Sequence, residues 1–242
     1  MAQALVPLKD MVEAKSRLSG VLGPAERRSL AQAMVEDVLT VLAGHPGISA
    51  VTLVSDDPAA GMLAAKYGIN HWLESALGCR GLNPVIARCC QLLALESKQP
   101  IVVLHADLPC LAASDITAVL DSLARHGGLI IGCDRHETGT NLLAFGAERP
   151  PQFSFGVESC ARHCAAAKVV GLSPLVLHRP GIALDIDEAP DLALLMDKID
   201  AGREGFSAAL LSAPQLGSRI RAQLASLAPA DGKIPDTGAI SK

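Results

Sequence analysis

Asp107 stands where an apolar run of strand length ends. The run 101–104 reads Ile-Val-Val-Leu, and Leu108-Pro109 follows the carboxylate. Because the run lacks polar alternation, it is typical of a parallel strand buried on both faces, and Pro109 cannot donate to a sheet. Ligands bind at the carboxyl edge of open α/β sheets, where carboxylates hold the Mg²⁺ that carries phosphates. Asp107 is therefore a candidate metal ligand; the alternative is a cap of the following turn.

A second pair of carboxylates lies in the segment Asp185-Ile186-Asp187. Residues i and i+2 of an extended segment project to one side, so the two charges point together. Adjacent like charges are costly unless a cation lies between them, and hard divalent ions take such oxygens together with phosphate oxygens. The pattern favours a metal site over an exposed acidic turn before the helix that Pro190 opens.

Three cations, Lys9, Lys15 and Arg17, follow the first apolar segment and would suit a polyphosphate, although charged surface loops are common. The loop 78–83 contains glycines that allow close approach to a ligand, and it ends in Asn83. Asn83 could face that ligand or simply cap the next helix.

Glycines and hydroxyls recur in Thr138-Gly139-Thr140 and in the segment from Phe155-Gly156 to Ser159. Backbone N–H groups in such loops, and the start of a helix at Ser159, can bind a small phosphate. An ordinary turn and an ordinary helix cap would explain each segment locally. His105 could face the same side as Asp107 and be a metal ligand, but a packed or hydrogen-bonding histidine is the more frequent case at a strand end.

Apolar segments of strand length alternate with helical patterns along most of the chain. Strands are expected at 4–8, 51–54, 70–73, from 101 to near 107, and at 129–131, 142–145, 175–177 and 182–186. Helices are expected at 24–44, 58–67, 84–95, after a cap at Ser114, and at 159–167, 190–199 and 206–224. This alternation predicts an α/β fold, with a mostly parallel sheet and helices on both faces. The loops at its carboxyl edge would carry the function.

The composition excludes several classes of protein. Of the 242 residues 50% are hydrophobic, the formal charge is −4, and aromatic residues comprise four Phe, one Tyr and one Trp. There is no basic footprint for nucleic acid and little aromatic surface for stacking bases. No apolar run approaches a membrane span, and no signal peptide is recognised at the N-terminus. The seven cysteines are expected as free thiols in a reducing cytoplasm.

The ordered set of motifs resembles the CofC family of phospholactate-type guanylyltransferases, which make the deazaflavin coenzyme F(420). The matching segments are Val6-Pro7-Leu8-Lys9, Ala14-Lys15-Ser16-Arg17-Leu18, Gly81-Leu82-Asn83, Ala106-Asp107-Leu108-Pro109, Asp134-Arg135-His136-Glu137-Thr138-Gly139-Thr140-Asn141, Phe155-Gly156 with Ser159, Ala161-Arg162-His163, and Asp185-Ile186-Asp187 before Pro190. The match is collinear from about residue 4 to 200. Each segment is a weak signal, whereas the ordered set is specific.

The resemblance implies a Rossmann-like fold of the nucleotide-diphospho-sugar transferase (GT-A) type, with one nucleotidyltransferase domain over residues 1–205. A helical extension is expected at 206–230, and a disordered tail at 231–242. The implied activity is guanylyl transfer from GTP to 2-phospho-L-lactate, phosphoenolpyruvate or 3-phospho-D-glycerate. The implied site has two Mg²⁺ ions on Asp107, Asp185 and Asp187, the acid at Thr140, Gly156 and Ser159, and the nucleotide near Asn83. The cations Lys9, Lys15 and Arg17 would face either the GTP phosphates or the charge of the acid.

The sequence departs from the family pattern at Glu137, Val157 and Cys160, which border the implied acid pocket. The identity of the acid therefore stays open. Two other functions also stay open: a transferase that uses CTP or UTP with a sugar or cyclitol phosphate, and a non-catalytic nucleotide-binding module. An exposed apolar edge could pair two subunits as a homodimer.

Overall fold

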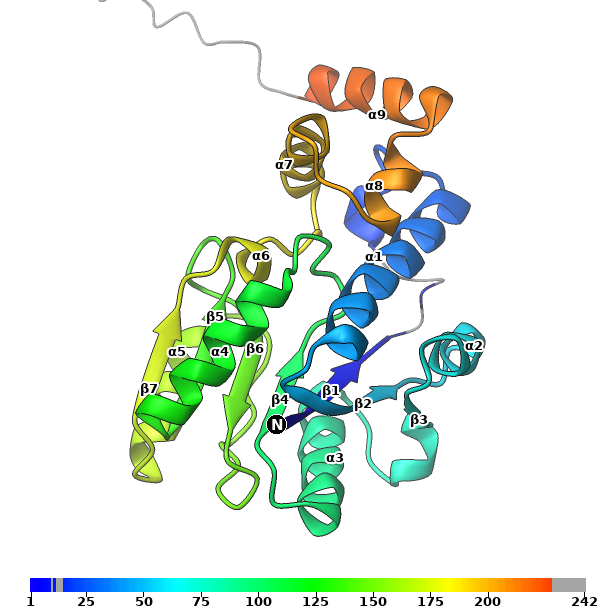
Figure 1. The fold of residues 1–242 in the computed structure, drawn as a ribbon. Coiled ribbons are helices and arrows are strands. Elements are labelled where there is room, and N and C mark those ends of the chain that lie inside the picture. Colours follow the sequence, from blue (N-terminus) through cyan, green and yellow to red (C-terminus); the bar gives the residue numbers. More distant parts are fainter. Residues whose placement is uncertain (10, 12–14, 228–242) are drawn as a thin grey trace, which may run out of the picture.

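A computed structural model describes the chain except residues 10, 12–14 and 228–242, and the predicted tail falls in that last range. In the described part, seven strands form one sheet in the order β3-β2-β1-β4-β6-β5-β7 (Figure 1). The strands are β1 Ala2–Pro7, β2 Ile48–Val54, β3 Asn70–Trp72, β4 Ile101–Leu104, β5 Leu129–Cys133, β6 Thr140–Phe145 and β7 Pro174–Leu177. The mostly parallel sheet that the sequence predicts is confirmed.

Strand β6 runs antiparallel to both of its neighbours, β4 and β5, whereas the other paired strands are parallel. Its register places Leu142 opposite both Leu104 and Gly132. Because of this reversal, β6 begins at the edge where β4 and β5 end. Thr140 therefore lies at the carboxyl edge of the parallel strands.

The helices are α1 Pro24–Gly44, α2 Pro58–Tyr67, α3 Leu82–Glu96, α4 Ala113–His126, α5 Ser159–Val169, α6 Pro180–Ala183, α7 Ala189–Asp200, α8 Phe206–Leu211 and α9 Pro214–Leu227, with short 3₁₀ turns η1 Ser16–Leu18 and η2 Glu74–Leu77. Alternate strand residues pack on opposite faces of the sheet. In β4, Val102 and Leu104 join the core formed with α1, α2 and α4, while Ile101 and Val103 join the core formed with α3 and α5.

Local signals at helix starts account for several boundaries. Pro24 occupies the first turn of α1, and the Asp57 carboxylate accepts a hydrogen bond from Ala59 N–H at the start of α2, at 2.8 Å. The sequence predicts that Ser114 caps the helix that follows it, but α4 already begins at Ala113 and Ala112 is its cap residue. There the Asp115 carboxylate accepts a hydrogen bond from Ala112 N–H at 3.0 Å.

The strand expected at 182–186 is wrong, and so is the single helix expected at 206–224. Pro180 opens the short helix α6 instead, and the apolar side chains that follow are buried without pairing in the sheet. Gly181 lies so close to Asp115 that an added Cβ would sit 2.0 Å from its carboxylate oxygen. Pro214 separates α8 from α9, because a proline in a helix interior clashes with the preceding turn.

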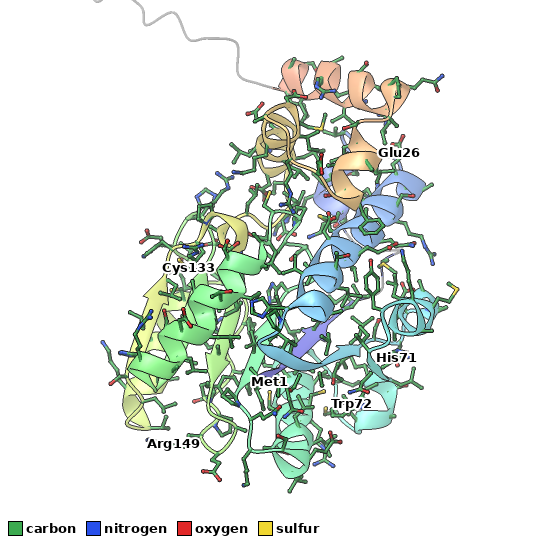
Figure 2. All side chains as sticks on the ribbon, in the orientation of Figure 1. Met1, Glu26, His71, Trp72, Cys133 and Arg149 are labelled. Atoms are coloured by element: carbon green, nitrogen blue, oxygen red, sulfur yellow. The ribbon has the colours of Figure 1, made fainter. Side chains whose placement is uncertain are left out.

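The last helices form a third apolar core with the start of α1. The buried Asp37 carboxylate of α1 accepts hydrogen bonds from Phe206 N–H at 2.6 Å and Ser207 N–H at 3.1 Å, at the start of α8. Arg219 of α9 donates a hydrogen bond to Glu26 of α1 at 2.6 Å, and Glu26 is labelled in Figure 2. The C-terminal helices are thus attached to α1 by polar as well as apolar contacts. Within the described ranges, no helix has the length and hydrophobicity needed to cross a membrane.

His163 of α5 joins three segments beneath the sheet edge. Its Nδ1 lies 3.0 Å from the Thr140 hydroxyl, and its Nε2 accepts a hydrogen bond from Ser154 N–H at 2.9 Å. The side chain is fully buried, and this burial lowers the pKa of His163 to about 4. Because Nε2 accepts a hydrogen bond, the ring is neutral and carries its proton on Nδ1.

We expect the neutral His163 to make stability depend on pH. The unfolded chain binds a proton near pH 6.5 and the folded one near pH 4, so the free energy of unfolding falls as pH falls through that window. Between pH 7 and 5, urea unfolding should show a loss about 2 kcal/mol larger in the native protein than in His163→Gln. Parallel pH profiles of the two proteins would contradict a buried neutral imidazole.

Candidate functional site

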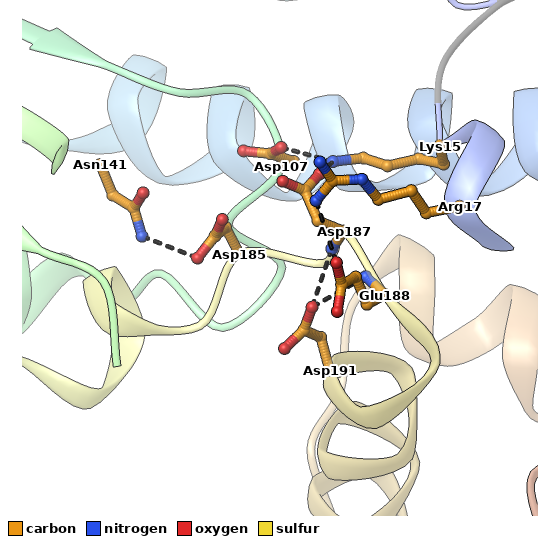
Figure 3. A network of polar contacts seen from close by, with 8 residues as sticks. All are labelled: Lys15, Arg17, Asp107, Asn141, Asp185, Asp187, Glu188 and Asp191. Atoms are coloured by element: carbon orange, nitrogen blue, oxygen red, sulfur yellow. Dashed lines mark hydrogen bonds and ion pairs between the residues drawn. The ribbon is translucent and has the colours of Figure 1, made fainter. Parts of the chain in front are cut away.

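Three carboxylates and one lysine meet at the carboxyl edge of the parallel strands (Figure 3). Asp107 follows β4, Asp185 and Asp187 lie between α6 and α7, and Lys15 precedes η1. A backbone hydrogen bond from Ile186 N–H to the Asp107 carbonyl oxygen, at 3.3 Å, ties the two acidic segments together. The structure thus brings together residues that are up to 172 positions apart in the sequence.

The Lys15 ammonium bridges two of the carboxylates. Its Nζ lies 2.5 Å from Asp107 Oδ2 and 2.8 Å from Asp187 Oδ1, and the lysine side chain is only 8% exposed. Burial alone would lower the pKa of Lys15, but the two carboxylates outweigh burial and raise it. Burial alone would raise the pKa of Asp107, but the opposing effects, led by the charge of Lys15, together hold that pKa below its ordinary value. Both groups are therefore charged at neutral pH.

Asp185 lies deeper than Asp187 and has a different partner. Asn141 Nδ2 donates to Asp185 Oδ1 at 3.1 Å and to the Ile182 carbonyl oxygen at 2.9 Å. Burial, followed by the charge of Asp107, raises the pKa of Asp185 to about 6. The role of Asn141 was not predicted from the sequence, although this residue directly follows Thr140.

A second polar pair holds the backbone that carries Asp187. Asp191 Oδ2 accepts hydrogen bonds from Asp187 N–H at 3.1 Å and Glu188 N–H at 2.8 Å. Arg135, from the β5–β6 loop, donates to Asp191 Oδ1 through Nε at 3.0 Å and Nη2 at 2.7 Å. The sequence analysis missed this pair; the signal was an acidic residue in the first turn of the helix that Pro190 opens.

The other two predicted cations lie nearer to solvent. Arg17 donates to Glu188 at 2.9 Å, and the Arg17 side chain is 70% exposed. Lys9 is exposed and lines a cavity of about 370 Å³ beside the carboxylates. The lining of this cavity is Pro7, Leu8, Lys9, Met11, Lys15, Ala31, Met34, Val35, Leu82, His105, Ala106, Asp107 and Asp187. Its lining combines apolar side chains with charged ones, as a site for a nucleoside with phosphates requires.

His105 lines this cavity and packs against Phe155, with ring centroids 5.2 Å apart. Its Nε2 is buried and has no hydrogen-bond partner among the described residues. Burial lowers the pKa of His105, so the imidazole is neutral. The packed histidine is confirmed, and it also presents one free ring nitrogen beside the cavity.

The predicted small-anion loops lie together on the same edge. Cys160 N–H donates to the Thr138 carbonyl oxygen at 3.0 Å, which joins the start of α5 to the β5–β6 loop. Thr140 and Ser159 are buried, whereas Gly156 is exposed with φ +120°, a conformation that favours glycine.

Asn83 supports one of these loops. Gly81 is the residue that caps α3, so the capping role for Asn83 is wrong. The Asn83 side chain instead accepts a hydrogen bond from Phe155 N–H at 2.7 Å and donates one to the Phe155 carbonyl oxygen at 3.2 Å. The proximity of Asn83 to a nucleotide stays a prediction.

The donor set fits Mg²⁺. In the ranges that the structure describes, no three His, Cys, Asp or Glu side chains already surround one point as ligands would. However, Asp107 Oδ1 is buried and has no hydrogen-bond partner among those residues, and Asp107 is close enough to raise the pKa of Asp185. Carboxylate oxygens are the hard ligands that Mg²⁺ requires. The predicted ion site stays a prediction that these residues suit.

A larger hollow of about 840 Å³ lies at the opposite edge of the sheet, near the start of β1. Its lining is mixed, with Lys98 and Arg149 near Glu148 and Asp121. The predicted site residues lie at the other edge. Size alone therefore does not identify the functional cavity.

The fold is shared with solved nucleotide transferases. A protein of Desulfovibrio desulfuricans G20, described as a nucleotide-diphospho-sugar transferase, superposes with a TM-score of 0.77 at 18% identity over 92% of this chain and 99% of that one. A 4-diphosphocytidyl-2C-methyl-D-erythritol synthase superposes with a TM-score of 0.56 at 12% identity, over 81% of this chain and 98% of that one. The predicted Rossmann-like, transferase-type fold is confirmed.

Sequence comparison is more specific than the fold. A phosphoenolpyruvate guanylyltransferase of Chloroflexus aggregans is 35% identical over 191 residues, covering 77% of this chain and 93% of that protein. A 3-phospho-D-glycerate guanylyltransferase of Phenylobacterium zucineum is 36% identical over 228 residues, covering 92% of this chain and all of that protein. The family model for CofC-like guanylyl transferases matches residues 2–205. The chain therefore belongs to the CofC-like guanylyl transferase family, and it is a nucleotidyltransferase.

Proposed function

We propose that this enzyme transfers GMP from GTP to the phosphate of a small phosphorylated carboxylic acid, with release of pyrophosphate, in coenzyme F(420) biosynthesis. The observation that carries the proposal is the cluster of Lys15, Asp107 and Asp187 beside the cavity at the ligand-binding edge. Membership of the CofC-like family supports guanylyl transfer. GTP is the donor that such a transfer requires if pyrophosphate is to leave.

The acceptor is phosphoenolpyruvate, 3-phospho-D-glycerate or 2-phospho-L-lactate. The first two appear in the names of relatives of similar identity, 35% and 36%. All three acids carry one phosphate and one carboxylate, so the same anion-binding loops could hold each. We place the acid against Thr140, Gly156 and Ser159, where two loops and a helix start converge.

The chemical step needs positioning more than acid–base catalysis. An acceptor phosphate oxygen forms a bond to the α-phosphorus of GTP, and the bond from that phosphorus to the bridging α–β oxygen breaks, so that pyrophosphate leaves with the electron pair. The acceptor phosphate is ionised at neutral pH, so no general base is required. The barrier comes from repulsion between anions and from charge on the leaving group, which Lys9, Lys15 and Arg17 can offset.

Asp107, Asp185 and Asp187 are the residues that would hold Mg²⁺, two ions being expected. When bound, magnesium would neutralise phosphate charge and help to align the reacting groups. The protein's own contribution is to fix these carboxylates before substrates bind. Asn141 fixes Asp185, and the Arg135–Asp191 pair fixes the backbone of Asp187.

Asp107→Asn should lower turnover by about 10²–10³, the usual effect of losing one electrostatic stabiliser in an active site. Turnover is measured as pyrophosphate release from GTP with each acid. Asp121→Asn is the matched control, because Asp121 is exposed and lies beside the hollow at the opposite edge of the sheet. Turnover of Asp107→Asn within about threefold of the native enzyme would mean that Asp107 only caps a turn.

Arg135→Met should weaken Mn²⁺ binding in the presence of nucleotide by about tenfold, the usual effect of losing a residue that orients a metal ligand. The reason is that Asp191 loses its guanidinium partner and holds the Asp187 backbone less firmly. Arg135→Lys should recover part of the affinity. Arg149→Met is the control, since Arg149 contacts backbone carbonyls of residues 170 and 171 instead. Unchanged Mn²⁺ affinity in Arg135→Met would contradict this positioning role.

Competition among the three acids should identify the acceptor. With GTP and an equimolar mixture, one guanylylated product should predominate by at least about tenfold, since a single methyl or hydroxyl is worth about 1–3 kcal/mol in a pocket. Mass spectrometry of the products measures the ratio. CTP or UTP giving faster pyrophosphate release than GTP would favour the alternative transferase, and no release with any acid would favour a non-catalytic module.

A further inference from the structure

We propose that Lys15 serves as the counter-cation of the metal-binding carboxylates in the free enzyme and gives them up to divalent metal when nucleotide binds. Its ammonium group would then move to the nucleotide phosphates. One lysine would thus hold two successive positions in a catalytic cycle. The inference rests on the proposed function and adds an order of binding to it.

The first observation is the position of the ammonium group. Nζ lies 2.5 Å from Asp107 Oδ2 and 2.8 Å from Asp187 Oδ1, between two of the three predicted metal ligands (Figure 3). A metal ion on the same two oxygens would require the space that Nζ occupies. Lys15 and the metal therefore compete for these carboxylates.

The second observation is that one carboxylate oxygen is still available. Asp107 Oδ1 is buried and has no hydrogen-bond partner among the described residues, although Oδ2 of the same carboxylate binds Lys15. Asp187 is also accessible, because its side chain is 52% exposed. A divalent ion can therefore begin to bind at the exposed Asp187 before Lys15 has left, and the unpartnered Asp107 Oδ1 offers it a second carboxylate oxygen as the lysine side chain turns away.

The third observation concerns where Lys15 can go. Lys15 and Lys9 line the same cavity as Asp107, so a phosphate chain in that cavity lies within reach of a rotated lysine side chain. The backbone of Lys15 is held by a hydrogen bond from Leu18 N–H to its carbonyl oxygen at 2.9 Å, and Leu18 is fully buried. The exchange can therefore occur by rotation of the side chain while the backbone stays in place.

These observations predict that nucleotide and metal bind cooperatively. Without nucleotide, metal must displace an ammonium group from the two carboxylates that it contacts, Asp107 and Asp187. With nucleotide, the phosphates accept that ammonium group, so both ligands bind more tightly together than alone.

The test is Mn²⁺ binding to metal-free protein without nucleotide, followed by electron paramagnetic resonance. Lys15→Gln should bind Mn²⁺ at least about tenfold more tightly than the native protein, because the attraction that competes with the metal exceeds one factor of ten in affinity. Lys98→Gln is the matched control and should bind as the native protein does. Like Lys15→Gln, Lys98→Gln removes the cation of an ion pair. Its partner is Glu148, and the pair lies at the opposite edge of the sheet.

Adding α,β-methylene GTP, which cannot react, should tighten Mn²⁺ binding in the native protein and much less in Lys15→Gln. Asp107→Asn should bind Mn²⁺ weakly in both conditions, which assigns the signal to this site. Mn²⁺ affinity in Lys15→Gln within about twofold of the native value, or below it, would overturn the proposal.

Amine labelling of the native protein gives a second test that does not depend on a variant. Lys15 should label slowly in the metal-free protein, approach the rate of the exposed Lys168 when Mn²⁺ alone is added at a concentration that saturates the metal site, and become protected again with Mn²⁺ and the methylene nucleotide. Labelling that ignores Mn²⁺ would refute the exchange. Pyrophosphate release from GTP and acid is measured in the same native protein. If labelling ignores Mn²⁺ but pyrophosphate is released, only the proposed exchange of Lys15 is refuted. If no pyrophosphate is released, the proposed function itself is refuted.

Discussion

The site depends on the charge balance around one carboxylate that the fold places largely out of water. Asp107 follows a central strand buried on both faces, so its ionised form carries a desolvation cost that can reach several kcal/mol. Lys15 compensates for that cost from a segment 92 residues earlier in the chain. The N-terminal loop is therefore coupled to the centre of the sheet by electrostatics, and any ligand that takes one partner must satisfy the other.

The remaining site residues act on the backbone and orientation of the carboxylates. Asn141 lies at the start of β6 and fixes Asp185, while Arg135, from the loop before β6, fixes Asp191 and through it the turn that carries Asp187. Catalysis of phosphoryl and nucleotidyl transfer depends mainly on such positioning. The rigid sheet alone does not supply it, because two of the three carboxylates lie on an irregular segment between α6 and α7.

Strand periodicity identified the central strand and the edge at which Asp107 lies, since an uninterrupted apolar run has few other interpretations. It could not indicate the direction of β6, because a buried run reads alike in both orientations. The apolar residues at 182, 184 and 186 are buried as a strand would require, but Pro180 starts the helical turn α6 instead. The contacts of Asn83 and of the Arg135–Asp191 pair join distant segments, and such pairs leave no local pattern.

The reversed direction of β6 has a consequence for how this architecture can diversify. A parallel strand would present only its final carbonyls at the ligand edge, whereas β6 enters the sheet there, directly after the loop 134–139. That loop and the first residues of β6 contact α5 through Thr138 and support the carboxylate segment through Arg135 and Asn141. Exchange of this hairpin in evolution would therefore alter the support of Asp185 and Asp187 as well, so the two parts of the site must diversify together.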